Sequence, residues 1–283
     1  MIVKRLWAVA AVIGLIGCAA TVPSQTSYPD PGQIRQLLPA DAILLGEQHD
    51  APDHQRIHRF VVETLAAERT LAALALEMAS QGQSTEMLGP DADEDLVRAA
   101  LHWNRGHWSW TVYGPVVMAA VRAGVPVVGA NLPAARLRET MADAGFDMLL
   151  PGPALQALQQ RIRLGHCNLL PESQVAPMAR IQIARDISMA QTVVKVALPG
   201  KTVLLLAGSS HVDRTLGIAQ HLPPGFNAKT VLLHAEKTPD ATKNRAGFDQ
   251  FWPTKPAPPV DYCADFSARR GQPATVPSPE KMP

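Results

Sequence analysis

Short, continuously apolar runs that alternate with longer helical patterns constrain the fold of this chain most. The runs lie at residues 42–45, 71–76, 125–129, 202–207 and 230–233. Apolar residues on both faces of a strand are typical of parallel sheets covered by helices on both sides. Helical patterns lie at residues 54–68, 93–101, 114–123, 134–144, 154–164 and 173–198. We therefore predict an α/β domain with a mainly parallel central sheet flanked by helices, and an aromatic-rich helical insertion.

The first residues carry the pattern of a secretory signal peptide. Lys4 and Arg5 precede an apolar run that ends at Gly17, directly before Cys18. This run is shorter than the ~20 residues that a membrane-spanning helix needs, so a transmembrane anchor is the weaker interpretation. Residues 15–18 also resemble the lipobox of bacterial lipoproteins, which implies cleavage before Cys18 and a lipid on its thiol.

Four segments follow from this interpretation. We expect a signal peptide at 1–17, a lipidated tether at 18–31, the α/β domain at 32–252 and a Pro-rich C-terminal extension at 253–283. The tether would hold the domain on a membrane. The residue after the lipidated cysteine is Ala19 and not an aspartate, which resembles lipoproteins exported to the outer membrane in enteric bacteria. We therefore expect an anchor in that membrane, with the domain facing the periplasm.

Charge and cysteine content narrow the function classes. The formal net charge is +1 and no run of Lys or Arg occurs, which argues against nucleic acid as a partner. Besides Cys18 the chain has only Cys167 and Cys263. In an oxidising compartment a disulfide between these two is the simplest interpretation, and two separate thiols are the alternative.

Polar side chains follow every predicted strand. These are the Gly46-Glu47-Gln48-His49 segment, Glu77, Asn131, the Gly208-Ser209-Ser210-His211 segment and His234. Open α/β sheets bind ligands at the carboxyl ends of their strands, so we expect these residues to converge on one cleft. Glycine before each motif would let the backbone turn sharply. Structural histidines held by hydrogen bonds are the alternative.

One chemistry of such a cleft is metal binding. His49, Glu77 and His211 could hold a divalent ion such as zinc or manganese, because imidazole and carboxylate suit these metals. Glu47 would then act as a general base, and the protein would be a metal-dependent hydrolase. His54 and His58 share a helical face, which would suit a metal pair, but an exposed polar face is the favoured explanation.

The same motifs resemble the ChaN-type haem-binding lipoproteins, in the superfamily that also holds Tiki and TraB proteins and erythromycin-esterase-like enzymes. Matching segments occur in order along the chain, at residues 45–50, 54, 77–78, 110–113, 129–133, 166–167, 171, 185–186, 189–190 and 208–211. The resemblance implies haem binding for haem or iron uptake, in dimers that hold two haems face to face through a tyrosine and a histidine. An outer-membrane haem receptor is a further implied partner. A Tiki-like protease or an esterase is the alternative.

Residues 102–113 offer aromatic faces for a porphyrin and iron ligands. Tyr113 is the first choice of axial ligand, with His107 and Trp110 beside it. Core packing, or a lid over the cleft, is the alternative role of this cluster. The other expected haem contacts are Asn131, His166 and Arg185, the last with a propionate.

Overall fold

The computed structural model describes residues 29–103, 108–235, 245–258 and 260–264. The expected signal peptide, the lipidated Cys18, most of the tether and His107 lie outside the described residues, and so does most of the expected C-terminal extension. Within the described ranges, no helix combines the length and the apolar character needed to cross a bilayer.

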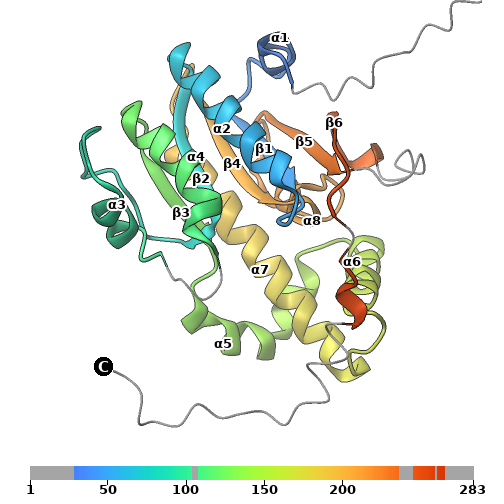
Figure 1. Ribbon diagram of the computed structural model, residues 1–283. Coiled ribbons are helices and arrows are strands. Elements are labelled where there is room, and N and C mark those ends of the chain that lie inside the picture. The colour runs from blue at the N-terminus through green and yellow to red at the C-terminus, as the bar shows by residue number, and fades with distance from the viewer. Residues whose placement is uncertain (1–28, 104–107, 236–244, 259, 265–283) are drawn as a thin grey trace, which may run out of the picture.

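Six parallel strands form one sheet in the order β3-β2-β4-β1-β5-β6 (Figure 1). They are β1 (Ala42–Glu47), β2 (Leu71–Ser80), β3 (Val127–Asn131), β4 (Thr202–Gly208), β5 (Ala228–Ala235) and β6 (Gln250–Thr254). The predicted α/β fold with a parallel sheet is confirmed. Most strands continue past the predicted apolar runs, so polar residues such as Glu47 and Glu77 lie inside the strands β1 and β2.

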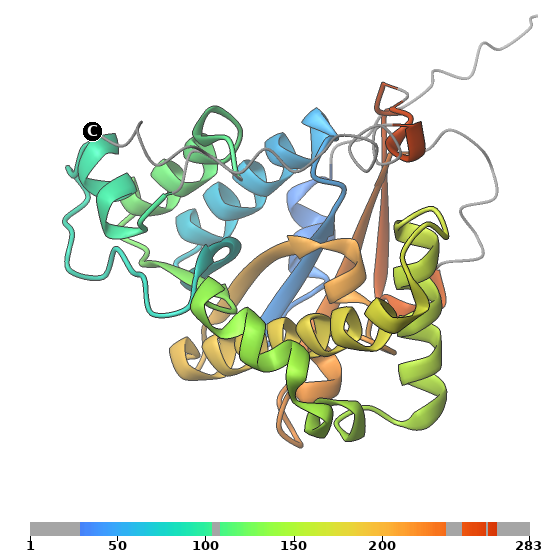
Figure 2. The ribbon, with the colours of Figure 1, turned by 90° about the horizontal axis from the view of Figure 1, so that it is seen from below.

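Helices cover both faces of this sheet (Figure 2). On one face lie α2 (Pro52–Ala67) and α4 (Trp110–Arg122), and on the other lies α7 (Glu172–Val196), with α5 (Leu137–Ala142) and α6 (Gly152–Gly165) beside it. The remaining helical elements are α1 (Pro31–Arg35), α3 (Glu94–Ala100), α8 (Ser209–Val212), and the 3-10 segments η1 (Ala134–Arg136), η2 (Ala144–Met148) and η3 (Ile218–His221).

Alternation along the strands divides the core into two layers. Ile43 and Leu45 of β1 pack with α2 and α4, whereas Ala42 and Leu44 pack on the α7 side. All four side chains are fully buried. Burial on both faces explains why the strands appear in the sequence as continuous apolar runs.

The structure differs from the prediction at the C-terminal edge. β6 was not predicted, because it is a five-residue segment that contains Pro253 and depends on pairing with β5. Proline is tolerated there because only one side of an edge strand is hydrogen-bonded. The expected domain boundary at residue 252 therefore falls inside a strand. On the other face of the sheet, α7 is continuous through Pro177.

A disulfide joins Cys167, at the turn between α6 and α7, to Cys263, with 5.6 Å between the Cα atoms. Residues 260–264 are exposed, and the hydroxyl of Tyr262 donates to Asp50 of the β1–α2 loop. The disulfide therefore attaches this exposed segment to the turn between α6 and α7.

Removal of the disulfide is expected to destabilise the fold. Its two cysteines are 96 residues apart in the sequence, and closing a loop of this length destabilises the unfolded chain by about 4.7 kcal/mol in the chain-entropy model. Urea unfolding of the wild type and of the double variant Cys167→Ser/Cys263→Ser should show a loss of this size. Equal unfolding midpoints and slopes would contradict a stabilising bond.

Candidate functional site

The site lies at a topological switch point of the sheet. Glu47 at the end of β1 is the register partner of Gly208 at the end of β4. Beyond β1 the chain enters α2 on one face, and beyond β4 it enters α8, whose Val212 packs on the opposite face. Adjacent strands whose connections leave to opposite faces open a crevice between them, where α/β proteins bind ligands.

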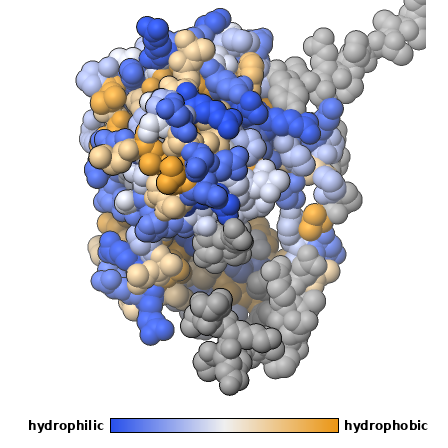
Figure 3. All heavy atoms as spheres, turned by 60° about the vertical axis from the view of Figure 1, so that its left-hand side comes forward, coloured by the Kyte–Doolittle hydropathy of each residue, from blue (hydrophilic) through white to orange (hydrophobic). Residues whose placement is uncertain are grey.

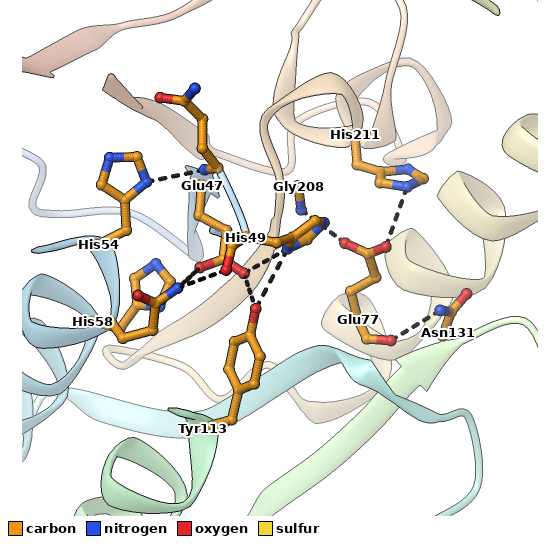
Figure 4. A network of polar contacts seen from close by, with 11 residues as sticks. Glu47, His49, His54, His58, Glu77, Tyr113, Asn131, Gly208 and His211 are labelled. Carbon is orange, nitrogen blue, oxygen red and sulfur yellow. Dashed lines mark hydrogen bonds and ion pairs between the residues drawn. The ribbon is translucent and has the colours of Figure 1, made fainter. Parts of the chain in front are cut away.

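The Glu47 carboxylate is the centre of a buried hydrogen-bond network (Figure 4). Its Oε1 accepts from the Tyr113 hydroxyl at 2.6 Å and from His49 Nδ1 at 2.8 Å. Its Oε2 accepts from Gln55 Nε2 at 3.1 Å and lies 3.6 Å from His58 Nδ1. Only 1% of Glu47 is exposed, so these donors replace the water that a carboxylate would otherwise need.

The surroundings of Glu47 decide its ionisation. Burial alone would raise its pKa, but the neighbouring His58 and the donors His49 and Tyr113 lower it below the ordinary value. For His49, burial opposes the charged form, and the bond to Glu47 together with the charge of Glu77 raises the pKa. Both shifts favour the pair of an ionised carboxylate and an imidazolium.

A second buried cluster joins β2 to α7 through His211. Its Nδ1 donates to Asp186 Oδ1 at 2.6 Å, and its Nε2 lies 3.5 Å from Glu77 Oε1. Burial disfavours the imidazolium, yet these two carboxylates raise the pKa of His211 to about 10. Glu77 also accepts from the Gly208 amide at 2.7 Å. Burial would raise its pKa, but His211, His49 and this amide bring it to about 2.

The glycines of the two motifs provide space rather than unusual turns. A Cβ atom on Gly208 would lie 3.0 Å from His49 Nε2. On Gly46 it would lie 3.1 Å from the Cα atom of Ser209. Both distances are tighter than ordinary contacts, so the motif segments of β1 and β4 can approach only because these side chains are missing.

The expectation that His54 and His58 lie on an exposed face of α2 is wrong, because both side chains are fully buried. His54 Nδ1 accepts from the Gln48 amide at 2.9 Å, so its Nε2 carries the proton and donates to Thr254 Oγ1 at 3.0 Å. Burial and the nearby His58 lower the pKa of His54 to about 4. These histidines therefore pack α2 against the strand ends.

The metal interpretation gains no support from the geometry. Across residues 29–103, 108–235, 245–258 and 260–264, no group of three or more His, Cys, Asp or Glu side chains is placed to hold a metal ion. The expected ligands His49, Glu77 and His211 are instead paired within the network, with Glu47, Gly208 and Asp186 as partners.

A cleft of about 260 Å³ opens beside this network at the ends of β2 and β3. Its lining residues are Glu77, Met78, Ala79, Ser80, Gln83, Leu101, His102, Trp108, Asn131, Leu132, Ala134, Leu137 and Arg185. Two buried polar atoms of this wall, Arg185 Nε and Asn131 Oδ1, make no hydrogen bond among the described residues.

On the side of the molecule that carries α3, apolar residues gather in a patch among hydrophilic ones (Figure 3).

A second cleft of about 300 Å³ lies beyond β1. Its lining residues are Gln48, Arg161, Ser209, Ser210, Asp213, Leu232, Leu233, His234 and Phe248. Arg161 and Asp213 form an ion pair across it. The polar strand ends thus border two clefts rather than one.

The expected haem contacts are distributed over different places. Asn131 and Arg185 line the first cleft. Tyr113 is 2% exposed and its hydroxyl donates a hydrogen bond to Glu47, which argues against the expected role as axial ligand. Trp110 packs on Trp103 and donates to Glu94, so it belongs to the packing of α3 on α4. His166 bonds to Ile162 at the end of α6, outside the lining of either cleft.

Sequence reasoning did not select two contributors to the site. Gln55 holds Glu47 from the first turn of α2, and His102 lines the first cleft. Trp108 forms part of the same wall and contacts the His49 ring at 4.7 Å between centroids. The dense aromatic segment was the available signal for His102 and Trp108, but its composition alone cannot tell which members face a cleft.

Fold and site together define an α/β protein with a cleft of mixed polar and apolar lining beside a buried charge network. The family model of haem-binding uptake proteins, ChaN, of the Tiki superfamily, matches residues 33–222. The chain therefore belongs to the ChaN-like haem-binding family, as its motifs predicted.

One solved structure agrees with this assignment. The structure of ChaN of Campylobacter jejuni with cofacial heme is similar, with 26% sequence identity, a TM-score of 0.59, and coverage of 73% of this chain and 86% of that chain. The type III effector HopBA1 has 15% identity and a TM-score of 0.46 over 80% of this chain and 91% of its own, which is too distant to support an argument. None of the curated proteins compared matches the chain.

Replacement of Tyr113 tests the Glu47 network. Tyr113→Phe removes the 2.6 Å bond to the buried carboxylate, and a hydrogen bond to a charged group contributes roughly 1.5–3 kcal/mol. We expect the free energy of unfolding in urea to fall by that amount. Tyr262→Phe, which removes a solvent-exposed bond from a tyrosine hydroxyl to Asp50, is the control and should change it little. Equal effects of the two variants would contradict the account.

Acid should destabilise the protein through His54. Its pKa is 6.5 ordinarily and about 4 in the fold, so between these values the unfolded chain binds a proton that the folded chain does not. The free energy of unfolding should therefore fall as pH drops from about 6.5 to about 4, with His54 contributing up to about 3 kcal/mol. His54→Gln can keep both hydrogen bonds without titrating, and should show a shallower dependence. An unchanged slope would refute the assignment.

Proposed function

We propose that this protein binds haem in the first cleft and serves haem or iron uptake. The observation that carries the proposal is the buried Nε of Arg185, a cationic donor without a hydrogen-bond partner among the described residues, on the wall of a cleft that also offers apolar and aromatic surface. Membership of a haem-binding uptake family, and the haem-bound relative from Campylobacter jejuni, support it.

The lining of the cleft suits a porphyrin. Leu101, Trp108, Leu132 and Leu137 offer apolar and aromatic surface, which packs well against a flat macrocycle. The second cleft is the poorer candidate, because its walls carry an ion pair and two serines that would have to be desolvated.

Arg185 supplies the charge that haem requires. A propionate is a carboxylate, and guanidinium groups form strong hydrogen bonds to carboxylates. Because Arg185 Nε is buried without a partner, an acceptor placed there removes an unsatisfied donor as well as neutralising charge. Asn131 Oδ1, the second unpaired atom of the wall, would accept from an ordered water beside the propionate.

The size of the cleft suggests how haem would be covered. Small-molecule sites are typically about 300–1,000 Å³, so a cleft of about 260 Å³ encloses only part of a haem. We propose that a second copy of the chain covers the exposed face. The cofacial haem arrangement of the Campylobacter jejuni relative supports this proposal.

Anchoring and partners complete the proposal. We infer that Cys18 carries a lipid which attaches the domain to the outer membrane, facing the periplasm, where an outer-membrane haem receptor would deliver its ligand. The motif around Cys18 in the sequence supports the anchor.

An absorption titration of ferric haem into residues 29–283 tests the function. We expect saturable binding with a shifted Soret band, and a Kd at least about tenfold higher for Arg185→Gln, since tenfold corresponds to 1.4 kcal/mol, the low end of a charged hydrogen bond. Lys195→Gln removes an exposed cation from the same helix and should leave the Kd unchanged. Non-saturable binding by the wild type would overturn the proposal.

A further inference from the structure

We propose that the second cleft, the one beyond β1, binds a small organic oxyanion, at a site separate from the cleft proposed for haem. Polar residues at the strand ends that the haem proposal does not use meet here: Gln48 after β1, Ser209 and Ser210 at the start of α8, and His234 in β5. Arg161 of α6 adds a guanidinium group to the lining. The proposal does not rest on haem binding.

The side-chain acceptors of this cleft are already occupied. Asp213 is the one carboxylate of the lining and is 4% exposed. Its Oδ1 accepts from the amide and the hydroxyl of Thr215, at 2.8 and 2.6 Å, and its Oδ2 accepts from Arg161 Nη2 at 2.5 Å. Gln48 Oε1 accepts from the Ala235 amide at 2.8 Å. A ligand that depends on donating to a carboxylate or an amide oxygen is therefore disfavoured.

The donors, by contrast, remain available. The hydroxyls of Ser209 and Ser210 and the imidazole of His234 make no hydrogen bond or ion pair with any described residue. Within the same part of the chain, Arg161 uses only Nη2, in its bond to Asp213, and 42% of its side chain is exposed. Carboxylate and phosphate oxygens accept from all three kinds of donor, and a guanidinium can bind them through two N–H groups. Spare donors beside occupied acceptors therefore select an oxyanion.

Carboxylates around the cleft do not oppose an anion, because cations neutralise them. Burial would raise the pKa of Asp213, but its bonds to Thr215 and Arg161 hold the pKa below the ordinary value, so Asp213 and Arg161 form a pair without net charge. Asp249, next to the lining residue Phe248, is likewise paired with Arg214. A bound oxyanion would therefore interact mainly with the unpaired N–H and O–H groups.

The cleft is preformed around Asp213. A Cβ atom on Gly247 would lie 2.4 Å from Asp213 Oδ1, so only glycine lets this segment approach the carboxylate. The Gly247 carbonyl in turn accepts from the Arg214 amide at 2.9 Å. Because the position of Arg161 is set by this carboxylate, little ordering would be needed when an anion binds.

Apolar residues define the rest of the ligand. Leu232, Leu233 and Phe248 also line the cleft. Leu232 and His234 are two residues apart in β5 and so point to the same face of the sheet, which places the imidazole beside apolar surface. The volume of about 300 Å³ is at the lower end for small-molecule sites. We therefore expect a compact organic carboxylate or phosphate ester with an apolar body.

Isothermal titration calorimetry of the full chain tests the inference with two probes, benzoate as an apolar carboxylate and phenyl phosphate as an apolar phosphate ester. At least one should bind saturably with one site per chain, and the lower Kd identifies the class of oxyanion. Ser209→Ala/Ser210→Ala removes two hydroxyls that hold no other residue, and should raise the Kd at least about tenfold, the low end for a hydrogen bond to a charged group. Arg161→Lys keeps the charge beside Asp213 but loses the planar fork, and should also weaken binding.

Ser173→Ala is the matched control, because Ser173 is exposed at the start of α7 and lines neither cleft. It should leave the Kd unchanged. The inference is overturned if neither probe binds saturably, or if Ser209→Ala/Ser210→Ala binds as tightly as the wild type. It is also overturned if Arg185→Gln is the variant that abolishes binding, since the oxyanion would then lie in the first cleft. Haem binding is measured separately, so either proposal can fail without the other.

Discussion

The buried carboxylate of Glu47 is the constraint on which the rest of the structure depends. Placing an ion at 1% exposure is costly unless its oxygens are hydrogen-bonded. Its donors come from three places in the sequence: His49 just after β1, Gln55 in α2 and Tyr113 in α4. Satisfying one charge therefore fixes the position of both helices on the sheet and closes the core beneath the cleft.

A division of roles follows from this arrangement. The charges of the network are satisfied internally, and His211 links Glu77 to Asp186 in the same manner on the α7 side. By contrast, Arg185 Nε and Asn131 Oδ1, in the wall of the first cleft, have no hydrogen-bond partner among the described residues. The buried network gives rigidity, and the unpaired groups at its margin are those available to a ligand.

Much of the fold could be predicted from the sequence, since burial on both faces marks β1 to β5 as apolar runs. β6 could not, because five residues around Pro253 become a strand only through pairing with β5. Strand-end position brought Glu47 and Glu77 into one region. The direction of a side chain cannot be inferred in this way: His54 was expected on an exposed face and is buried, and the hydroxyl of Tyr113 points at a carboxylate rather than a cofactor.

The most direct measurement is a crystal structure of residues 29–283 soaked with haem, in which anomalous scattering locates the iron. The account predicts one iron peak per chain in the cleft at the ends of β2 and β3, and a propionate on Arg185. An iron peak in the second cleft beside Ser209 and His234, or at the surface away from both clefts, would contradict it.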